Sequence, residues 1–239
     1  MKKTPEPPQK ITPITTNSSF SLTYKTPNNE IVKSDTAPIK NKDTQTLLTF
    51  FKSLKSFQID SDQTQLIPVT SADNDFIIKA RNQKEQHYLG TGHLSEQGHQ
   101  TFIDAYMKTD NDLYFIAKSK QKNVPIGTIA LHNINPRHKN AEIGRFFILP
   151  AYRLLALDVC RLLHIFAFEI LELKTLIGFQ VADNTAAKSY IQYGYQHDGC
   201  FRQCHLNNGT LKDINIFSLT EKEYYILKKK YHTFFTAKK

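Results

Sequence analysis

The chain has 239 residues, of which 40% are hydrophobic and 22% are charged, a balance typical of a globular protein with a buried core. A formal net charge of +9 would suit nucleic acid or an anionic small ligand, but much of the excess lies near the ends, in Lys2, Lys3 and residues 228–230. No nucleic-acid motif accompanies that charge, so composition excludes an overall disordered chain and gives little support to a nucleic-acid-binding protein.

No apolar run reaches the length of a bilayer span, because the most apolar segment, residues 162–173, is interrupted by His164, Glu169 and Glu172. The first residues, MKKTPEPPQK, place prolines and polar residues where a secretory leader needs an apolar stretch. The three cysteines, Cys160, Cys200 and Cys204, are too few and too unevenly spaced for a disulfide framework. We therefore expect free thiols and a cytoplasmic protein.

Residues 1–63 are expected to form an N-terminal extension that is partly disordered. Two strand-like segments flank the turn signal at residues 27–29 and predict a small hairpin. Asp43 can cap a following helix, in which Leu47, Leu48 and Phe51 fall at helical spacing. No chemistry is predicted for this segment.

A folded domain is expected over residues 64–232, with a basic tail at 233–239. It begins with a strand from Thr64, a helix over residues 71–83, and a second helix for which Ser95 is the expected cap. Three strands joined by polar turns follow at residues 112–119, 124–134 and 141–149, which predicts an antiparallel meander.

After Pro150 the apolar spacing changes to the helical period, and predicts a core helix over residues 157–173. A strand at 174–181 then returns beside its predecessor, which makes a parallel crossover. A short helix at 184–195 precedes a hairpin around Asn207, Asn208 and Gly209, and a last amphipathic helix follows it.

This order of elements, together with residues 125–153 and 184–199, resembles the GNAT superfamily, and in particular its ribosomal-protein and amino-sugar acetyltransferase branches. The resemblance implies an α+β fold with a mixed, mostly antiparallel central sheet flanked by helices. It also implies an N-acetyltransferase, which moves an acetyl group directly from acetyl-CoA, a co-substrate, to a primary amine.

The resemblance also implies residues that bind CoA. The family's phosphate loop reads Gln or Arg, two variable residues, Gly, one variable residue, then Gly or Ala. The matching positions here keep the basic residue and lose both glycine-type positions; they are Arg153, Leu154, Leu155, Ala156, Leu157 and Asp158. A helix N-terminus favours a pyrophosphate, but the Asp158 carboxylate would repel one if it faced the ligand, which leaves either a shifted CoA or no CoA.

Three further positions are assigned by the same resemblance. Phe146 and Ile148, on the central strand, would present backbone groups to the pantetheine arm. Asn184 would contact CoA, cap its own helix, or do both.

Tyr190, six residues after Asn184, matches the tyrosine that the family places near the departing thiolate as general acid. The alternative is a tyrosine that packs beneath the sheet. Glu142 lies on the central strand and could take a proton from the acceptor ammonium, directly or through water. The alternative for Glu142 is an ordinary hydrogen-bonded strand carboxylate.

No metal is expected. Cys200, Cys204 and His205 are compactly spaced, but no second ligand pair accompanies them, and strand spacing sends both cysteines to one face as core residues. The segment with His87, His93 and His99 would help form the acceptor pocket in the resembling family, or carry exposed histidines.

The sequence leaves the acceptor open among a protein N-terminus, a small amine and the amino group of a nucleotide-linked sugar, and it leaves a homodimer possible. The alternative function is that of a binding protein: a catalytically silent GNAT-fold module that binds a ligand or partner. Asp158 is the strongest argument for that reading.

Overall fold

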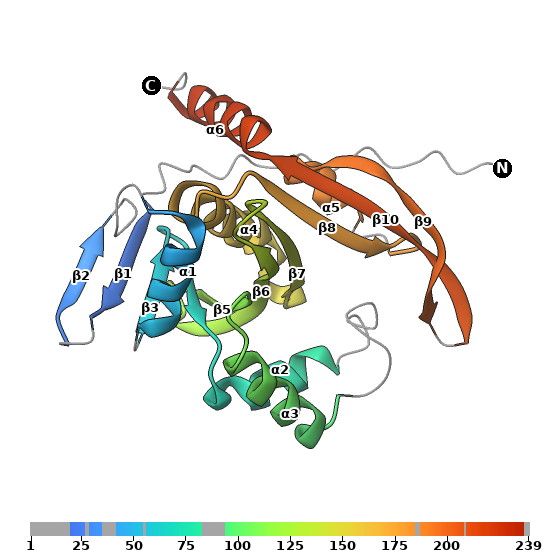
Figure 1. Cartoon of the computed structure of the whole chain (residues 1–239), viewed down its shortest axis with the longest axis horizontal. Helices are drawn as coiled ribbons and strands as arrows, with labels where there is room; N and C mark the ends of the chain where they lie inside the picture. The colour runs from blue at the N-terminus through green and yellow to red at the C-terminus, as the bar shows by residue number, and fades with distance from the viewer. Residues whose placement is uncertain are drawn as a thin grey trace.

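The computed structural model describes residues 20–26, 29–34, 42–54, 56–82, 94–184, 187–207 and 209–236. Its strands form one ten-stranded sheet in the order β2-β1-β3-β4-β5-β6-β7-β8-β10-β9, which Figure 1 shows from the blue N-terminal edge to the red hairpin. The strands are β1 (Ser21–Lys25), β2 (Ile31–Ser34), β3 (Ser56–Asp60), β4 (Thr64–Pro68), β5 (Leu113–Ser119), β6 (Val124–Asn135), β7 (Asn140–Ile148), β8 (Thr175–Val181), β9 (Gln196–Asn207) and β10 (Thr210–Thr220).

The α-helices are α1 (Thr44–Ser53), α2 (Asn74–Arg81), α3 (Glu96–Met107), α4 (Ala156–Ile165), α5 (Ala187–Gln192) and α6 (Glu221–Thr236). Neighbouring strands are antiparallel except β7 and β8, which pair in parallel through the crossover that contains α4. The expected mixed, mostly antiparallel sheet with flanking helices is therefore confirmed.

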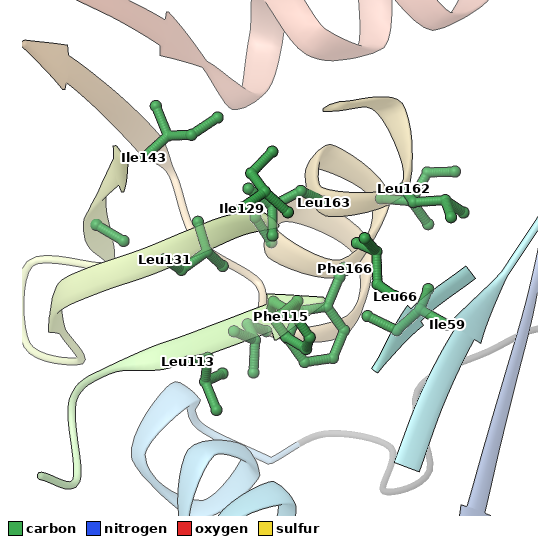
Figure 2. Close-up of a cluster of buried hydrophobic side chains, with 14 of the residues drawn as sticks. Ile59, Leu66, Leu113, Phe115, Ile129, Leu131, Ile143, Leu162, Leu163 and Phe166 are labelled. Carbon is green, nitrogen blue, oxygen red and sulfur yellow. The ribbon is translucent and has the colours of Figure 1, made fainter. Parts of the chain in front are cut away.

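Helices cover the two faces of the sheet. On one, which we call face A, Phe115 and Leu131 of the sheet join a buried cluster with Leu163 of α4 and with apolar residues of α1, as Figure 2 shows in part. On the other, face B, Ala130 packs with Ile77 of α2 and with α3. Alternate residues of each strand supply the two clusters, as the pleat requires.

The predicted core helix consists of three parts. A 3-10 helix, η3 (Pro150–Leu155), runs into α4, and one π turn, η4 (Phe166–Ile170), follows it. The Leu171 N–H donates to the Phe166 carbonyl at 2.9 Å, which closes the wider turn. Residues 171–173 therefore lie beyond the helix that was expected to include them.

The segment before residue 64 forms a hairpin of β1 and β2, then α1 and β3. Asp43 caps α1 by accepting from the Thr46 N–H at 2.9 Å. Because β3 pairs with β4 and the Phe57 ring stacks on Phe166 at 5.9 Å, this segment shares the sheet and core of the rest of the chain. The division at residues 63 and 64 stays an interpretation, and residues 1–19 and the end of the basic tail, 237–239, lie outside the described residues.

Ser95 caps α3, with Oγ accepting from the Gly98 N–H at 3.1 Å. Gly209, at φ +76°, turns the β9–β10 hairpin. All three cysteines are free thiols, but Cys200 and Cys204 are exposed, so the expectation that they face the core is wrong. The reason is that β9 is the last strand of the sheet and most of its residues face solvent.

Among the described residues, no helix is both long enough and apolar enough to cross a membrane. In the same part of the chain, no group of three or more His, Cys, Asp and Glu side chains is placed to hold a metal ion.

Candidate active site

The parallel ladder between β7 and β8 ends inside the sheet. Its last pair is Ile143 with Gly178. Beyond it, β7 continues to Ile148 paired with β6 alone, and β8 continues to Val181 paired with β10 alone. The two central strands therefore part here, and we call the region beyond this last pair, between the two strands, the opening.

A β-bulge lies on β7 at this opening. Ala130 pairs with Gly144 and Thr128 with Phe147, so Arg145 and Phe146 together oppose one residue of β6. Arg145 has a φ of +47° and is held from both sides: its carbonyl accepts from Thr128 Oγ1 at 2.7 Å, and its guanidinium binds both oxygens of Asp112 at 2.7 Å.

The bulge decides which way the following side chains point. Arg145 contacts the Phe102 and Tyr114 rings on face B, whereas Phe146 and Ile148 pack against the face A cluster. Phe146 and Ile148 thus lie where a ligand entering from face A would meet them. The sequence predicts a regular strand around Arg145. The signal that could have found the bulge is Gly144, because an isolated glycine within a strand pattern often marks a bulge or a close approach.

Tyr190, on α5, reaches the end of the ladder from face A. Its ring stacks on Phe217 at 5.0 Å and meets Tyr195 edge-on at 5.2 Å. A Cβ on Gly178 would lie 2.3 Å from its Cε1 and 3.0 Å from its hydroxyl oxygen, so only glycine admits the ring at this point. Burial raises the pKa of Tyr190 above its usual 10, so the phenol keeps its proton at neutral pH.

Glu142 lies on face B, where it pairs with His132 across the β6–β7 ladder. Its Oε1 accepts from Asn133 Nδ2 at 2.8 Å, and its Oε2 lies 3.7 Å from His132 Nδ1. The side chain is 27% exposed. Glu142 is therefore a hydrogen-bonded strand carboxylate that is still reachable from solvent.

His132 was not singled out from the sequence, yet its ring covers the backbone beside the opening. A Cβ on Gly144 would lie 2.4 Å from His132 Nε2. Burial and the positive charge of Arg145 lower the pKa of His132, against the opposing effects of Glu142 and Asp112. The sequence offers only a histidine on the strand before Glu142. That the two residues face each other could be predicted only with the register of the two strands known.

The expected phosphate loop takes a different form. Arg153 is exposed, as expected of a phosphate ligand, but it belongs to η3, in which the Tyr152 N–H donates to Leu149 O at 2.8 Å. The Ala156 N–H donates in turn to Arg153 O. These two backbone donors are therefore engaged within the chain, and a 3-10 helix replaces the open, glycine-rich loop of the family pattern.

The remaining positions of that pattern differ in exposure. Leu154 is 77% exposed and Leu157 is 40% exposed, whereas Leu155 packs against the face A cluster. The Asn184 N–H donates to Val181 O at 2.9 Å. Whether the Asn184 side chain caps its helix stays a prediction, because residues 185–186, which would begin that helix, lie outside the described residues.

Asp158 is turned into the protein. Only 4% exposed, it accepts from Ser61 Oγ at 2.5 Å and from Thr64 Oγ1 at 2.6 Å, and Arg161 lies 3.3 Å from its second oxygen. In this conformation its carboxylate does not face solvent, so the repulsion that its charge suggested does not arise. The strongest argument for a silent module is removed.

Two of the three histidines before and in α3, His87 and His93, lie outside the described residues. His99 is buried and stacks on Phe102 at 5.9 Å, so the expectation of an exposed histidine is wrong for this position. The α2–α3 pair packs over face B and shelters the ring.

Comparison with protein families now decides the assignment: residues 64–192 match the family model described as an acetyltransferase (GNAT) domain. The chain belongs to the GNAT acetyltransferase family. The sequence resemblance is thereby confirmed, and the chain is an N-acetyltransferase by family.

Individual relatives agree with this GNAT assignment. The chain is 28% identical over 171 residues to YoaA, an uncharacterized N-acetyltransferase of Bacillus subtilis strain 168. The aligned region covers 68% of this chain and 96% of YoaA. A GCN5-related N-acetyltransferase from Brucella melitensis shares the fold at a TM-score of 0.65, with 22% identity over 74% of this chain and 84% of that one.

The spermidine N-acetyltransferase from Vibrio cholerae, solved with CoA and spermine, shares the fold at a TM-score of 0.59. It is 20% identical and covers 68% of this chain and 98% of its own. At this identity the likeness concerns the fold alone.

Proposed function

We propose that the chain transfers an acetyl group from acetyl-CoA directly to a primary amine. One observation carries the proposal. At the end of the β7–β8 ladder, Gly178 leaves room for the Tyr190 phenol on face A, and Gly144 leaves room for His132, beside Glu142, on face B. A proton donor and a proton acceptor thus approach one opening from opposite faces.

The residues fit the thioester end of acetyl-CoA, which supplies the acetyl group. Phe146 and Ile148 lie on face A beside the opening, and the bulge takes the Arg145 and Phe146 backbone out of the regular ladder. A backbone N–H there would stabilise the oxyanion. The phosphate end fits less fully, because η3 uses its own donors; we assign that end to the exposed Arg153 guanidinium.

The chemistry balances with three proton transfers within the site. The ammonium of the acceptor gives one proton to the His132–Glu142 pair, and the neutral amine attacks the thioester carbonyl. The C–N bond forms, the C–S bond breaks, and the thiolate takes a proton from the neutral Tyr190 phenol. The acylated nitrogen then gives its second proton to the Tyr190 phenolate, which restores the phenol, and the His132–Glu142 pair releases its proton to solvent. This is direct transfer, with no covalent acyl-enzyme.

The acceptor is proposed only as a primary amine. Glu142, partly exposed on face B, is an anionic group that an ammonium could approach. A fold shared with a spermidine enzyme makes polyamines a first choice for screening, beside a peptide N-terminus and a nucleotide-linked amino sugar.

The test starts with isothermal titration of acetyl-CoA. We expect micromolar binding that Arg153→Ala weakens about 10- to 100-fold, the value of a lost charge-assisted phosphate contact. Arg137→Ala, which removes an exposed arginine from the β6–β7 turn, is the matched control and should bind as the unchanged chain does. A screen of spermidine, spermine, an alanyl peptide and a nucleotide-linked amino sugar would follow, with CoA release as the readout.

A second candidate, the silent GNAT-fold binding module, is favoured by one observation, the 3-10 helix in place of the phosphate loop. Absence of acetyl-CoA binding at millimolar concentration would favour it over the enzyme. We also propose a cytoplasmic location, which the free, exposed thiols of Cys200 and Cys204 support; cell fractionation would test it.

A further inference from the structure

We propose that His132 is the catalytic base that accepts the proton of the acceptor ammonium, and that Glu142 is a positioning residue that orients it. The inference rests on the proposed acetyl transfer and assigns the base within the His132–Glu142 pair.

The position of the ring favours His132. Its Nε2 lies above Gly144, the residue directly after Ile143 in the last pair of the β7–β8 ladder. The His132 side chain is 22% exposed, and Nε2 makes no hydrogen bond within the described residues. An unengaged ring nitrogen therefore lies at the edge of the opening, where an amine from face B would arrive.

Glu142 is less suited to take the proton itself. One of its oxygens already accepts from Asn133, which has a φ of +50° where the β6–β7 register shifts between His132 and Asn135. The other oxygen faces His132 Nδ1 at 3.7 Å. A carboxylate at this distance forms an ion pair with the ring once the ring is protonated, so it can attract Nδ1 and stabilise the imidazolium that forms.

The charges that face His132 suit a base. Glu142 and Arg145 approach from β7, and Asp112 approaches from the turn before β5. Arg145 is itself paired with Asp112, so these two charges largely offset each other and Glu142 leaves the cluster one negative charge. Burial is the largest influence and lowers the pKa of His132, so the ring is neutral at pH 7 and has a free lone pair.

The discriminating experiment compares the pH dependence of kcat/KM for His132→Gln and Glu142→Gln, with whichever amine of the four-member screen turns over best. We expect His132→Gln to lower kcat by about 100- to 10,000-fold, the usual contribution of a general base, and to leave the acetyl-CoA Kd within about twofold. Glu142→Gln should retain activity. The acidic limb of its kcat/KM profile should move to lower pH, because the variant removes a negative charge that raises the pKa of His132.

The matched control is His138→Gln, an exposed histidine in the turn that joins the same two strands, and it should leave rate and pH profile unchanged. Gly144→Ala provides a second route to the same group, because its new Cβ would meet His132 Nε2 and displace the ring. We expect it to lower kcat without weakening acetyl-CoA binding. Circular dichroism and thermal unfolding would establish that each variant is folded.

Two results would overturn the inference. If Glu142→Gln abolishes activity while His132→Gln keeps the acidic limb, Glu142 is the base. If folded His132→Gln is as active as the unchanged chain, His132 is not the base and Glu142 does not act by orienting it. A chain that acetylates none of the four amines at any pH would instead count against the proposed acetyl transfer, and this assignment would fall with it.

Discussion

Asp158, at the start of α4, accepts a hydrogen bond of 2.6 Å from Thr64, the first residue of β4, and both side chains are buried. Ser61, in the turn between β3 and β4, binds the same carboxylate oxygen. The carboxylate thus joins the start of α4, which directly follows η3 and its Arg153, to the strand pair at which the N-terminal segment enters the sheet.

Asp158→Ala should lower the free energy of unfolding by about 2–4 kcal/mol, because it leaves two buried hydroxyls and Arg161 without their acceptor. Urea unfolding measures this, with Asp198→Ala, an exposed aspartate on β9, as the control. The acetyl-CoA Kd of the folded variant should stay unchanged. Tighter CoA binding without loss of stability would instead mean that the carboxylate faces the phosphates.

Gly178→Ala should displace Tyr190. The new methyl group would lie 2.3 Å from the phenol ring, and overpacking of this kind costs about 1–3 kcal/mol of stability. We expect kcat to fall at least tenfold as the ring moves away from the opening. Gly199→Ala on β9 is the control, because nothing lies within 4 Å of its added Cβ; equal activities of the two variants would argue against the position assigned to Tyr190.

Tyr190→Phe should lower kcat by about 100- to 10,000-fold if the hydroxyl is the general acid. The fold should be little affected, because the ring contacts remain and the hydroxyl makes no hydrogen bond within the described residues. The raised pKa of Tyr190 keeps the phenol protonated up to at least pH 10, so it should add no basic limb below that pH. Steady-state kinetics would decide, with Tyr225→Phe on α6 as control; wild-type kcat in Tyr190→Phe would remove the acid role.

His164 should make stability depend on pH. It is buried, with Nε2 3.0 Å from the Tyr195 hydroxyl, and burial lowers its pKa to about 3. The unfolded chain, with a histidine pKa of about 6.5, binds one more proton between these values. Stability from His164 is therefore complete above about pH 6.5 and is lost as the pH falls towards 3, at up to about 1.4 kcal/mol per pH unit.

Urea unfolding between pH 4 and 8 tests this by giving the free energy of unfolding as a function of pH. In His164→Gln the slope of that plot below about pH 6.5 should be smaller by the contribution of one proton. His138→Gln, whose histidine is exposed, should keep the slope of the unchanged chain. An unaltered slope in His164→Gln would show that other groups carry the acid sensitivity.

Short-range patterns in the sequence were enough for much of the fold. Asp43 and Ser95 cap α1 and α3 because a side-chain oxygen two or three residues before a free backbone N–H satisfies it locally. The glycine after Asn208 turns the last hairpin, and alternation of apolar residues places the strands. These features depend on neighbours along the chain, and so does the motif that led to Tyr190.

The tertiary structure decided what depends on the register between strands. The bulge at Arg145 reverses which residues of β7 face the helices on face A, and the isolated Gly144 beside it does not by itself fix its position or direction. The ring of His132 reaches Gly144, and the carboxylate of Asp158 reaches Thr64, only once distant segments have paired. The sequence by itself therefore predicted the family and most of the elements, and it proposed Tyr190 as the acid. It missed β3, because the predicted helix extends through residues 56 and 57, whereas the helix stops at Ser53. The packed sheet decided which way Asp158 turns and which side chain lies opposite Tyr190, because both follow from contacts between residues far apart in the chain.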